Sequence, residues 1–256
     1  MLAVAAACRV ASVDYAGKQC PCPSGYSCDP AAMTCVRGAL ADAAVDAGVS
    51  CPADGFFCDG FETGDTSRWS TTDVSAGATL AVESATVHTG AFALDGNVPA
   101  MPTNGALSAV IEQFPTLSTG TLAARMWLYL PQPLVNFDSV LTLGSSPHTI
   151  TIDADNGGHW TATEHTPSAN PPDHVSTTLA VTAAWTCLEL DYQFATGVGA
   201  AVITLYIQDG VVLTVAAADP AAMYGQARVG VSRADMAGDE VIADDVVLAT
   251  QHIGCN

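Results

Sequence analysis

The chain has 256 residues, and its 7 basic and 26 acidic side chains give a formal net charge of −19. This charge repels phosphate backbones and anionic membrane surfaces, so it excludes nucleic acid as a partner and favours neutral over polyanionic polymers as ligands. A chain of this length can hold one sandwich domain of about 200 residues with a sizeable core, and one small module beside it.

The first residues, Met1 to Cys8, place small apolar side chains before a cysteine. They resemble the tail of a bacterial lipoprotein signal, in which the cysteine is lipidated, although the charged region and most of the apolar region are missing. Nine cysteines and a single lysine, Lys18, are typical of an oxidising compartment. We expect residues 1–8 to be the remnant of an export signal, and the protein to be extracellular or on the outer cell surface. Cys8 is either the site of a lipid anchor, or an extra disulfide partner or free thiol.

Residues 9–37 are rich in cysteine, with proline, glycine and aspartate at turn positions and almost no large apolar residues. Such a segment cannot fold by burial alone, so we expect two disulfides. Of the possible pairings we predict the interleaved one, Cys20 with Cys28 and Cys22 with Cys35. A zinc site is disfavoured because the four cysteines lack two spaced C-x-x-C pairs. The spacing resembles small EGF-like modules, which implies a spacer or stalk.

Residues 38–50 form an Ala/Asp-rich linker by composition, and residues 51–256 form the main domain. Here segments of alternating polarity recur between Gly, Pro, Asn and Asp clusters, which predicts an all-β sandwich or barrel. In Gln208-Asp209-Gly210 the Asp-Gly pair is expected to supply the positive φ of a tight hairpin. The predicted strands include 79–83, 106–111, 121–130, 139–143, 149–153, 175–181, 185–194, 201–207, 211–215, 227–232 and 241–249.

Alternation assigns faces to two of these strands. In 121–130, Arg125, Trp127 and Tyr129 lie opposite the apolar positions, and in 185–194 the polar positions likewise lie opposite the leucines. If this polar face is the concave side of a curved sheet, a cation and two aromatic rings form a platform for a sugar. The predicted carbohydrate-binding residues are Arg125, Trp127, Tyr129, Glu189, Asp191 and Gln193.

Cys51, Cys58, Cys187 and Cys255 remain in the main domain. If its first and last strands are adjacent, Cys58 lies near Cys255, which leaves Cys51 for Cys187. The alternative joins the near neighbours Cys51 and Cys58, and pairs Cys187 with Cys255. The sequence leaves both arrangements open.

Five short motifs, in this order, resemble the concanavalin-like jelly-roll superfamily, close to laminin-G-like domains. The resemblance covers roughly residues 55–255 and implies an antiparallel two-sheet jelly-roll β-sandwich whose first and last strands pair. It also implies a carbohydrate-linked role, and a structural calcium ion held by Glu62 and Asp245, which supply oxygen ligands of the kind that calcium prefers. The motifs are Phe61-Glu62-x-Gly64 with Trp69, Val87-His88-Thr89-Gly90, Trp185-x-Cys187-Leu-Glu189, Leu205-Tyr206 with Asp209-Gly210, and Asp244-Asp245-Val246.

The motifs of enzymes with this fold are absent. The Glu-x-Asp-x-x-Glu string of laminarinase-like members is missing, and its nearest substitutes are Glu189-Leu-Asp191 and Asp153-Ala-Asp155. A polar strand face is the commoner explanation for both pairs. The strings of alginate-lyase-like sandwiches are also missing. The residues that could serve a lyase as base or as neutraliser of a carboxylate are His148, His159, His165, His174, Tyr129, Arg125 and Gln193. We interpret the four histidines as surface-loop residues.

These features predict a monomeric extracellular or cell-surface protein that binds a polysaccharide or cell-surface glycan, like a lectin, without turnover. Membrane contact is expected only through the lipid anchor, because no stretch is long and apolar enough to span a bilayer. The first alternative is a polysaccharide lyase or glycoside hydrolase that uses the concave face. The second is a structural or adhesive protein that binds another protein.

Overall fold

The computed structural model describes residue 18 and the ranges 26–29, 34–37, 51–100, 105–134, 138–166, 173–195, 200–218, 223–234 and 238–255. The chain divides into two compact units, Met1–Val45 and Asp46–Asn256. In the first unit β1 (Tyr26–Asp29) and β2 (Thr34–Arg37) form an antiparallel pair. The disulfides predicted for this unit, and the role of Cys8, lie outside what the structure describes.

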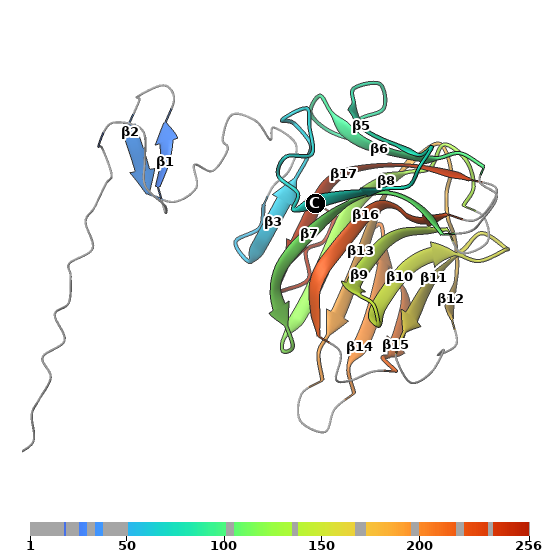
Figure 1. The fold of residues 1–256 in the computed structure, drawn as a ribbon. Coiled ribbons are helices and arrows are strands. Elements are labelled where there is room, and N and C mark those ends of the chain that lie inside the picture. Colours follow the sequence, from blue (N-terminus) through green and yellow to red (C-terminus); the bar gives the residue numbers. More distant parts are fainter. Residues whose placement is uncertain are drawn as a thin grey trace, which may run out of the picture. The chain divides into compact units, whose positions relative to one another are not determined.

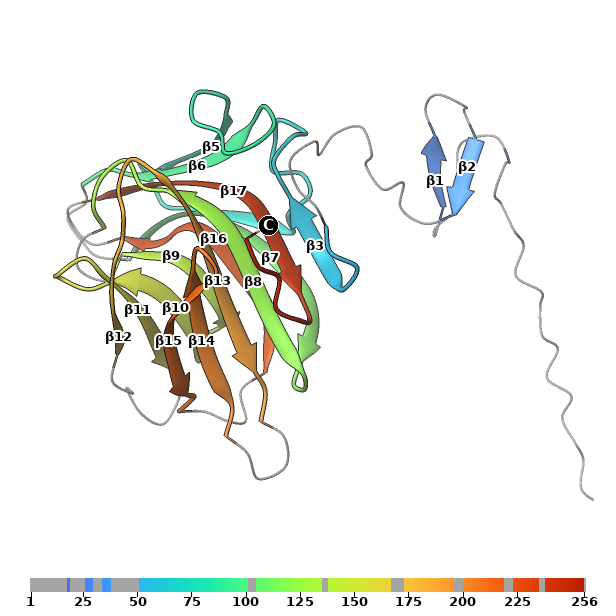
Figure 2. The same ribbon diagram turned by 180° about the vertical axis from the view of Figure 1, so that it is seen from behind.

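The second unit is all β within its described residues, and Figures 1 and 2 show its two layers from opposite sides. All strand pairs are antiparallel. This confirms the predicted two-sheet antiparallel sandwich. Its strands are β3 (Gly55–Asp59), β4 (Thr71–Val74), β5 (Thr79–Glu83), β6 (Ala93–Val98), β7 (Ala106–Leu117), β8 (Thr121–Tyr129), β9 (Ser139–Ser145), β10 (His148–Ala154), β11 (His159–His165), β12 (His174–Leu179), β13 (Trp185–Gln193), β14 (Val202–Ile207), β15 (Gly210–Ala216), β16 (Tyr224–Ala234) and β17 (Asp239–Ala249).

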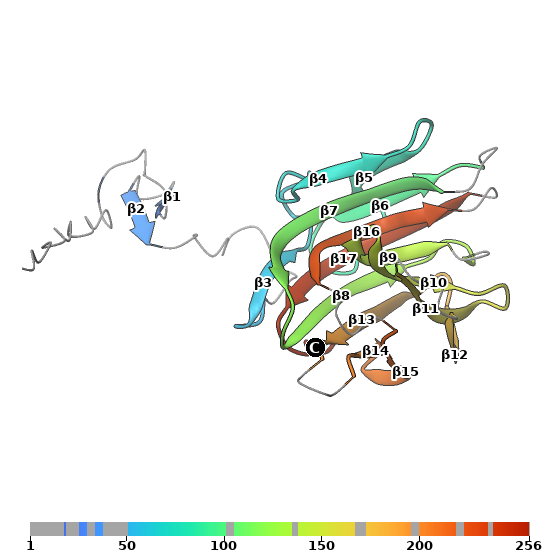
Figure 3. The same cartoon turned by 60° about the horizontal axis from the view of Figure 1, so that its bottom comes forward.

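The seven-stranded sheet has the order β12-β11-β10-β9-β16-β7-β4, and the eight-stranded sheet has the order β15-β14-β13-β8-β17-β6-β5 with β3 paired to β17. Figure 3 shows β7 and β16 of the first sheet beside β6 and β17 of the second, and these strands are in contact. The apolar side chains between the sheets form one continuous core. Among the described residues, no helix has the length and apolarity needed to cross a bilayer.

The core follows from the alternation of the sequence. In β8 the apolar positions Leu122, Met126 and Leu128 are completely buried, as are Leu190 and Tyr192 of β13. Each large apolar side chain that is fully buried contributes about 1.5–3 kcal/mol, so this core is the main stabilising feature of the sandwich.

The first and last strands of the sandwich pair as expected, with Cys58 opposite Val247 and Asp59 opposite Val246. The motif after β3 has a structural function here. The buried Asp59 carboxylate accepts hydrogen bonds from the Phe61 amide (3.1 Å) and from Trp69 Nε1 (2.7 Å). These bonds fix the chain as it leaves β3.

The disulfides join Cys51 to Cys58 and Cys187 to Cys255. The structure therefore has the pairing of near neighbours, and the pairing of Cys58 with Cys255 is wrong although β3 and β17 are adjacent. The reason is the course of the chain after β17. The C-terminal segment, residues 250–255, crosses to β13, where it meets Cys187 and Glu189.

The hairpin between β14 and β15 is present, but its turn differs from the prediction. Gln208 and Asp209 have positive φ (53° and 62°), whereas Gly210 is the first residue of β15 and pairs with Ile207. A two-residue turn with both central residues at positive φ matches the right-handed twist of the strands. The turn is therefore centred one residue earlier than the Asp-Gly pair.

The four histidines from 148 to 174 were expected to lie in surface loops, and this is wrong. His148 begins β10, and His159 and His165 begin and end β11. His174 begins β12. Strands β10 and β12 match the predicted strands 149–153 and 175–181, whereas β11 was not predicted, because threonine and histidine occupy its outward positions.

Candidate functional site

The outward face of the eight-stranded sheet carries the residues that the sequence predicts to bind carbohydrate. The apolar positions of β8 and β13 fill the core, so the residues between them point away from it. The strand register places Glu189 opposite Arg125, and Trp185 opposite Tyr129. The structure thus brings six predicted residues to one face: Arg125, Trp127, Tyr129, Glu189, Asp191 and Gln193.

Four rings gather on this face, and we call them the aromatic patch: His88, Trp127, Tyr129 and Trp185. His88 stacks on Trp127 with ring centroids 3.8 Å apart and planes at 15°. The ring centroid of Trp185 lies 5.5 Å from that of His88 and 5.6 Å from that of Tyr129. All four side chains are half-buried, so the patch reaches solvent. Alternation along β13 could have identified Trp185, but His88 comes from an irregular segment and no periodic signal marks it.

Two adjacent acids of β17 hold His88 in the patch. His88 Nδ1 lies 2.6 Å from Asp245 Oδ2, and the His88 amide donates to Asp244 Oδ2 (2.9 Å). Thr89 Oγ1 also donates to the Asp245 carboxylate. Burial raises the pKa of Asp244 to about 7, helped by the charge of Asp245. The regular strand geometry is interrupted here, because Asp245 has a φ of 50° beside a register shift in β17.

Glu62 and Asp245, the predicted calcium ligands, both contact the segment 88–92. The Glu62 carboxylate accepts hydrogen bonds from the amides of Ala91 (2.9 Å) and Phe92 (3.0 Å). Gly90 has a φ of 69°, and a Cβ at this position would collide with Glu62. Each predicted ligand is therefore tied to the same segment by hydrogen bonds, and calcium at this place stays a prediction.

The C-terminal segment covers part of the predicted surface. Arg125 donates from Nη1 to the carbonyl oxygen of Gly254 and from Nη2 to that of Asp245, at 3.2 Å each. Glu189 is completely buried and accepts from the amides of Ile253 (2.6 Å) and Gly254 (2.8 Å). Burial lowers the pKa of Arg125, against the raising effect of the nearby Asp245 and Glu189 charges.

The C-terminal segment leaves fewer of the predicted carbohydrate-binding residues accessible to a ligand. Arg125 and Glu189 are 4% and 0% exposed, so they cannot touch a polymer chain while the segment is in place. Asp191 is also largely buried, whereas Gln193 is exposed and Trp127 and Tyr129 are half-buried. The direct contacts available to a glycan on this face are therefore mainly those of the aromatic patch.

Beside the patch lies an acidic cluster with one imidazole, which we call the His252 cluster: Glu189, Asp191 and His252. One ligand atom from each residue lies within 4.8 Å of the others. His252 Nδ1 is 3.1 Å from both Glu189 Oε1 and Asp191 Oδ2. Burial raises the pKa of Asp191 to about 7, and the charge of Glu189 adds to this effect. The arrangement is a possible metal-binding triad.

A second polar region lies on the outward face of the seven-stranded sheet around Asp153 in β10. Asp153 is 2% exposed, accepts from Thr151 Oγ1 (3.2 Å) at Oδ2, and has no described hydrogen-bond partner at Oδ1. Thr161 Oγ1 on β11, opposite Asp153, is likewise buried and without a described partner. Burial raises the pKa of Asp153 to about 8, and nearby Asp173 adds to this. A carboxyl that stays protonated near neutral pH can act as a general acid.

Asp155, the other acid of the Asp153-Ala-Asp155 pair, has a structural function. Its Oδ1 atom accepts from the amides of Gly157 and His159, at 2.8 Å each, and caps the turn between β10 and β11. These bonds lower its pKa, with that from His159 foremost. Within the described part of the chain, the four histidines from 148 to 174 join no group of three metal-ligating residues.

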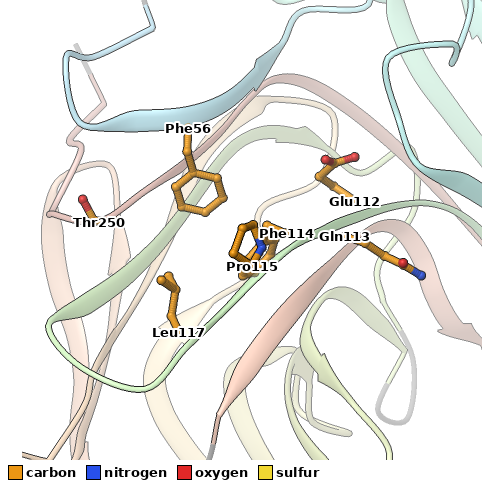
Figure 4. Close-up of a pocket in the computed structure, with 7 residues that line it drawn as sticks. All are labelled: Phe56, Glu112, Gln113, Phe114, Pro115, Leu117 and Thr250. Atoms are coloured by element: carbon orange, nitrogen blue, oxygen red, sulfur yellow. The ribbon is translucent and has the colours of Figure 1, made fainter. Parts of the chain in front are cut away.

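An apolar hollow of about 330 Å³ lies between β3 and the end of β7 (Figure 4). Phe56 and Phe114 line it with ring centroids 5.1 Å apart. Its one acid, Glu112, is engaged by the amide and hydroxyl of Ser70. The hollow therefore lacks the converging polar groups of a catalytic site. It is lined by Phe56, Glu112, Gln113, Phe114, Pro115, Leu117 and Thr250.

No protein-family model matches the chain, and no curated protein matches it by sequence. Solved structures do share its fold. A cellulose-induced protein, Cip1, is 16% identical with a TM-score of 0.59, and the match covers 78% of this chain and all (100%) of that one. An endo-β-1,4-glucuronan lyase from the fungus Trichoderma reesei is 14% identical with a TM-score of 0.60, over 77% of this chain and 96% of that one. At these identities the likeness shows the sandwich fold alone.

Proposed function

We propose that this protein binds a polysaccharide or a cell-surface glycan, without turnover, through the aromatic patch. The observation that carries this proposal is the contiguous group of half-buried rings on an outward sheet face, with centroid distances from 3.8 to 5.6 Å. Aromatic faces offer a large apolar area on which the C–H groups of a sugar ring can pack. Tryptophan and tyrosine also carry one polar group each, an indole N–H or a hydroxyl, that can hydrogen-bond a sugar.

The similar structures support a polysaccharide ligand in general, and the charge favours a neutral one. The net charge of −19 disfavours strongly anionic polymers at long range, so a neutral polysaccharide is the expected ligand. The two similar structures include a protein named for its induction by cellulose and a lyase of glucuronan, a polysaccharide.

The second candidate function is a polysaccharide lyase or glycoside hydrolase centred on Asp153, and a specific observation favours it. The Asp153 carboxyl has an unpartnered oxygen and a pKa raised to about 8, so it is suited to give a proton to a leaving oxygen. Because Asp153 is 2% exposed, this role requires the side chains around it to move aside when a polymer binds. Arg233 is near enough for its charge to lower the Asp153 pKa, and it could neutralise a uronate carboxylate.

Product formation distinguishes the two candidates. If Asp153 is catalytic, the protein releases reducing ends or unsaturated products from a polysaccharide, and Asp153→Asn lowers the rate at least about a hundredfold, the usual contribution of general acid catalysis. Asp155→Asn is the matched control, because Asp155 caps a turn. Product release that persists in Asp153→Asn rejects this role for Asp153, and the absence of products from every polymer rejects the enzyme candidate.

We further propose export to the cell surface, with Cys8 as a lipid anchor, and a structural calcium ion at the segment 88–92. Glu62, Asp245 and the Thr89 hydroxyl supply oxygen ligands at this segment. Calcium is then expected to raise the melting temperature of the wild-type protein and not of Glu62→Gln. Equal melting temperatures of the wild type in calcium and in chelator would contradict the calcium proposal.

A further inference from the structure

The His252 cluster is built from strand β13 and the C-terminal segment, which are far apart in the sequence. Glu189 and Asp191 alternate along β13 and therefore point to the same outward face. His252 belongs to the C-terminal segment. This segment is fixed on both sides of its histidine, by the end of β17 before it and by the disulfide between Cys255 and Cys187 after it. The imidazole is thus held over the two carboxylates by the backbone.

The spacing of the donor atoms suits a small cation. In a tetrahedral zinc site with bonds of about 2.0–2.1 Å, two ligand atoms lie about 3.3 Å apart. His252 Nδ1 lies 3.1 Å from Glu189 Oε1 and 3.1 Å from Asp191 Oδ2. One ring N–H cannot point well at two acceptors, whereas one metal ion can bind both oxygens and the nitrogen.

A second observation points to a ligand here. Asp191 is 8% exposed, and its Oδ1 atom is buried with no hydrogen-bond partner among the described residues. A buried carboxylate oxygen without a partner is costly, and binding a cation removes that cost. The side chain of His252 is 47% exposed, so an ion can reach the cluster from solvent.

The surroundings resemble those of known metal sites in two respects. Protein groups hydrogen-bond the metal-binding carboxylates in such sites, and here the amides of Ile253 and Gly254 bind Glu189. The Tyr206 ring packs 4.4 Å from the His252 ring and restricts its orientation. Asp209, which accepts from the Cys255 amide, adds a further negative charge near the cluster.

We propose that Glu189, Asp191 and His252 bind a divalent cation of the zinc class, which fastens the C-terminal segment to β13. One imidazole nitrogen with two carboxylate oxygens suits zinc and its transition-metal neighbours, whereas calcium and magnesium prefer oxygen ligands alone. The site is distinct from the segment 88–92, where calcium is proposed. Its occupancy does not depend on glycan binding.

The test is titration calorimetry of the full chain with zinc chloride, and separately with calcium chloride. We expect zinc binding that is at least about tenfold weaker in His252→Ala and in Asp191→Asn, since removing even an outer partner of a metal ligand costs about that much. His159→Ala is the matched control, because His159 is also partly exposed and also lies beside an aspartate. This variant should bind zinc like the wild type, because the proposed site and the disulfides are unchanged.

Thermal unfolding gives a second readout. Zinc should raise the melting temperature of the wild type and of His159→Ala, and should leave that of His252→Ala unchanged, because only a bound ion stabilises the folded state by mass action. Equal zinc affinity in the wild type and His252→Ala overturns the proposal. So does a wild type that binds no zinc, in which case His252 only forms ion pairs with the two acids.

Discussion

The sandwich is expected to lose stability as the pH rises from about 5 to about 8, which is the reverse of ordinary acid denaturation. Four carboxyls have raised pKa values, and burial is the first cause for each. The values are about 6 for Asp95, about 7 for Asp191 and Asp244, and about 8 for Asp153. Nearby acids add to the shift in every case.

The direction follows from proton binding. Between the ordinary aspartate pKa near 3.8 and the raised value, the folded protein keeps these protons while the unfolded chain has lost them. Their stabilising contribution is therefore full below the unfolded pKa and disappears as the pH rises through the folded pKa. Each pH unit in this window costs up to about 1.4 kcal/mol for the buried Asp153, and less for the half-buried Asp95, whose charge is screened by solvent.

The measurement is the melting temperature in metal-free buffers across this pH range. Asp153→Asn should reduce the fall, because an amide cannot ionise and has no charge to desolvate. Asp155→Asn should leave the slope unchanged, because the pKa of Asp155 is lowered and does not titrate in this window. A melting temperature that stays level or rises from pH 5 to pH 8 would show that these carboxyls ionise normally.

Replacing Trp185 with alanine is expected to weaken polysaccharide binding by at least about 2 kcal/mol, or about thirtyfold, as for a central aromatic contact in an interface. Trp185 contacts both His88 and Tyr129, so its loss opens the middle of the aromatic patch. Trp127→Ala should also weaken binding. Because His88 stacks on one face of the Trp127 ring, the other rings of the patch supply much of the area on which a sugar can stack.

The control for this prediction is Phe56→Ala. Phe56 is an aromatic residue that is 41% exposed but lines the apolar hollow instead of the patch. Its replacement should leave the affinity unchanged. If Trp185→Ala and Trp127→Ala bind the polysaccharide as tightly as the wild type, the patch is not the binding surface.

Much of the fold could be predicted from the sequence because its signals are local. The alternation in β8 and β13 identified the core face, and it placed Arg125 and Glu189 together on the opposite face before any coordinates. The pairing of the first and last strands was also correct. Strand β11 was not recognised, because a histidine at each end and polar outward residues hide the buried Trp160 and Ala162.

The site could be predicted only in part, because non-local contacts decide which of its residues are covered and which further residues join it. Nothing in the periodicity of residues 250–255 indicates that this segment crosses β13 and covers Arg125. For the same reason His252 could not be placed beside Glu189, and His88 could not be placed on Trp127. The polar face was predicted from the alternation, whereas the segment that covers it and the third residue of the proposed metal site, His252, depend on the course of irregular segments.

The most direct test of the proposed function is size-exclusion chromatography of the protein with a panel of neutral and acidic polysaccharides. We expect at least one neutral polymer to co-elute with the wild type, with the size of the polymer unchanged. The same polymer should elute separately from the Trp185→Ala variant. If no polymer retains the protein, or if a polymer elutes as smaller fragments after incubation, glycan binding without turnover is contradicted.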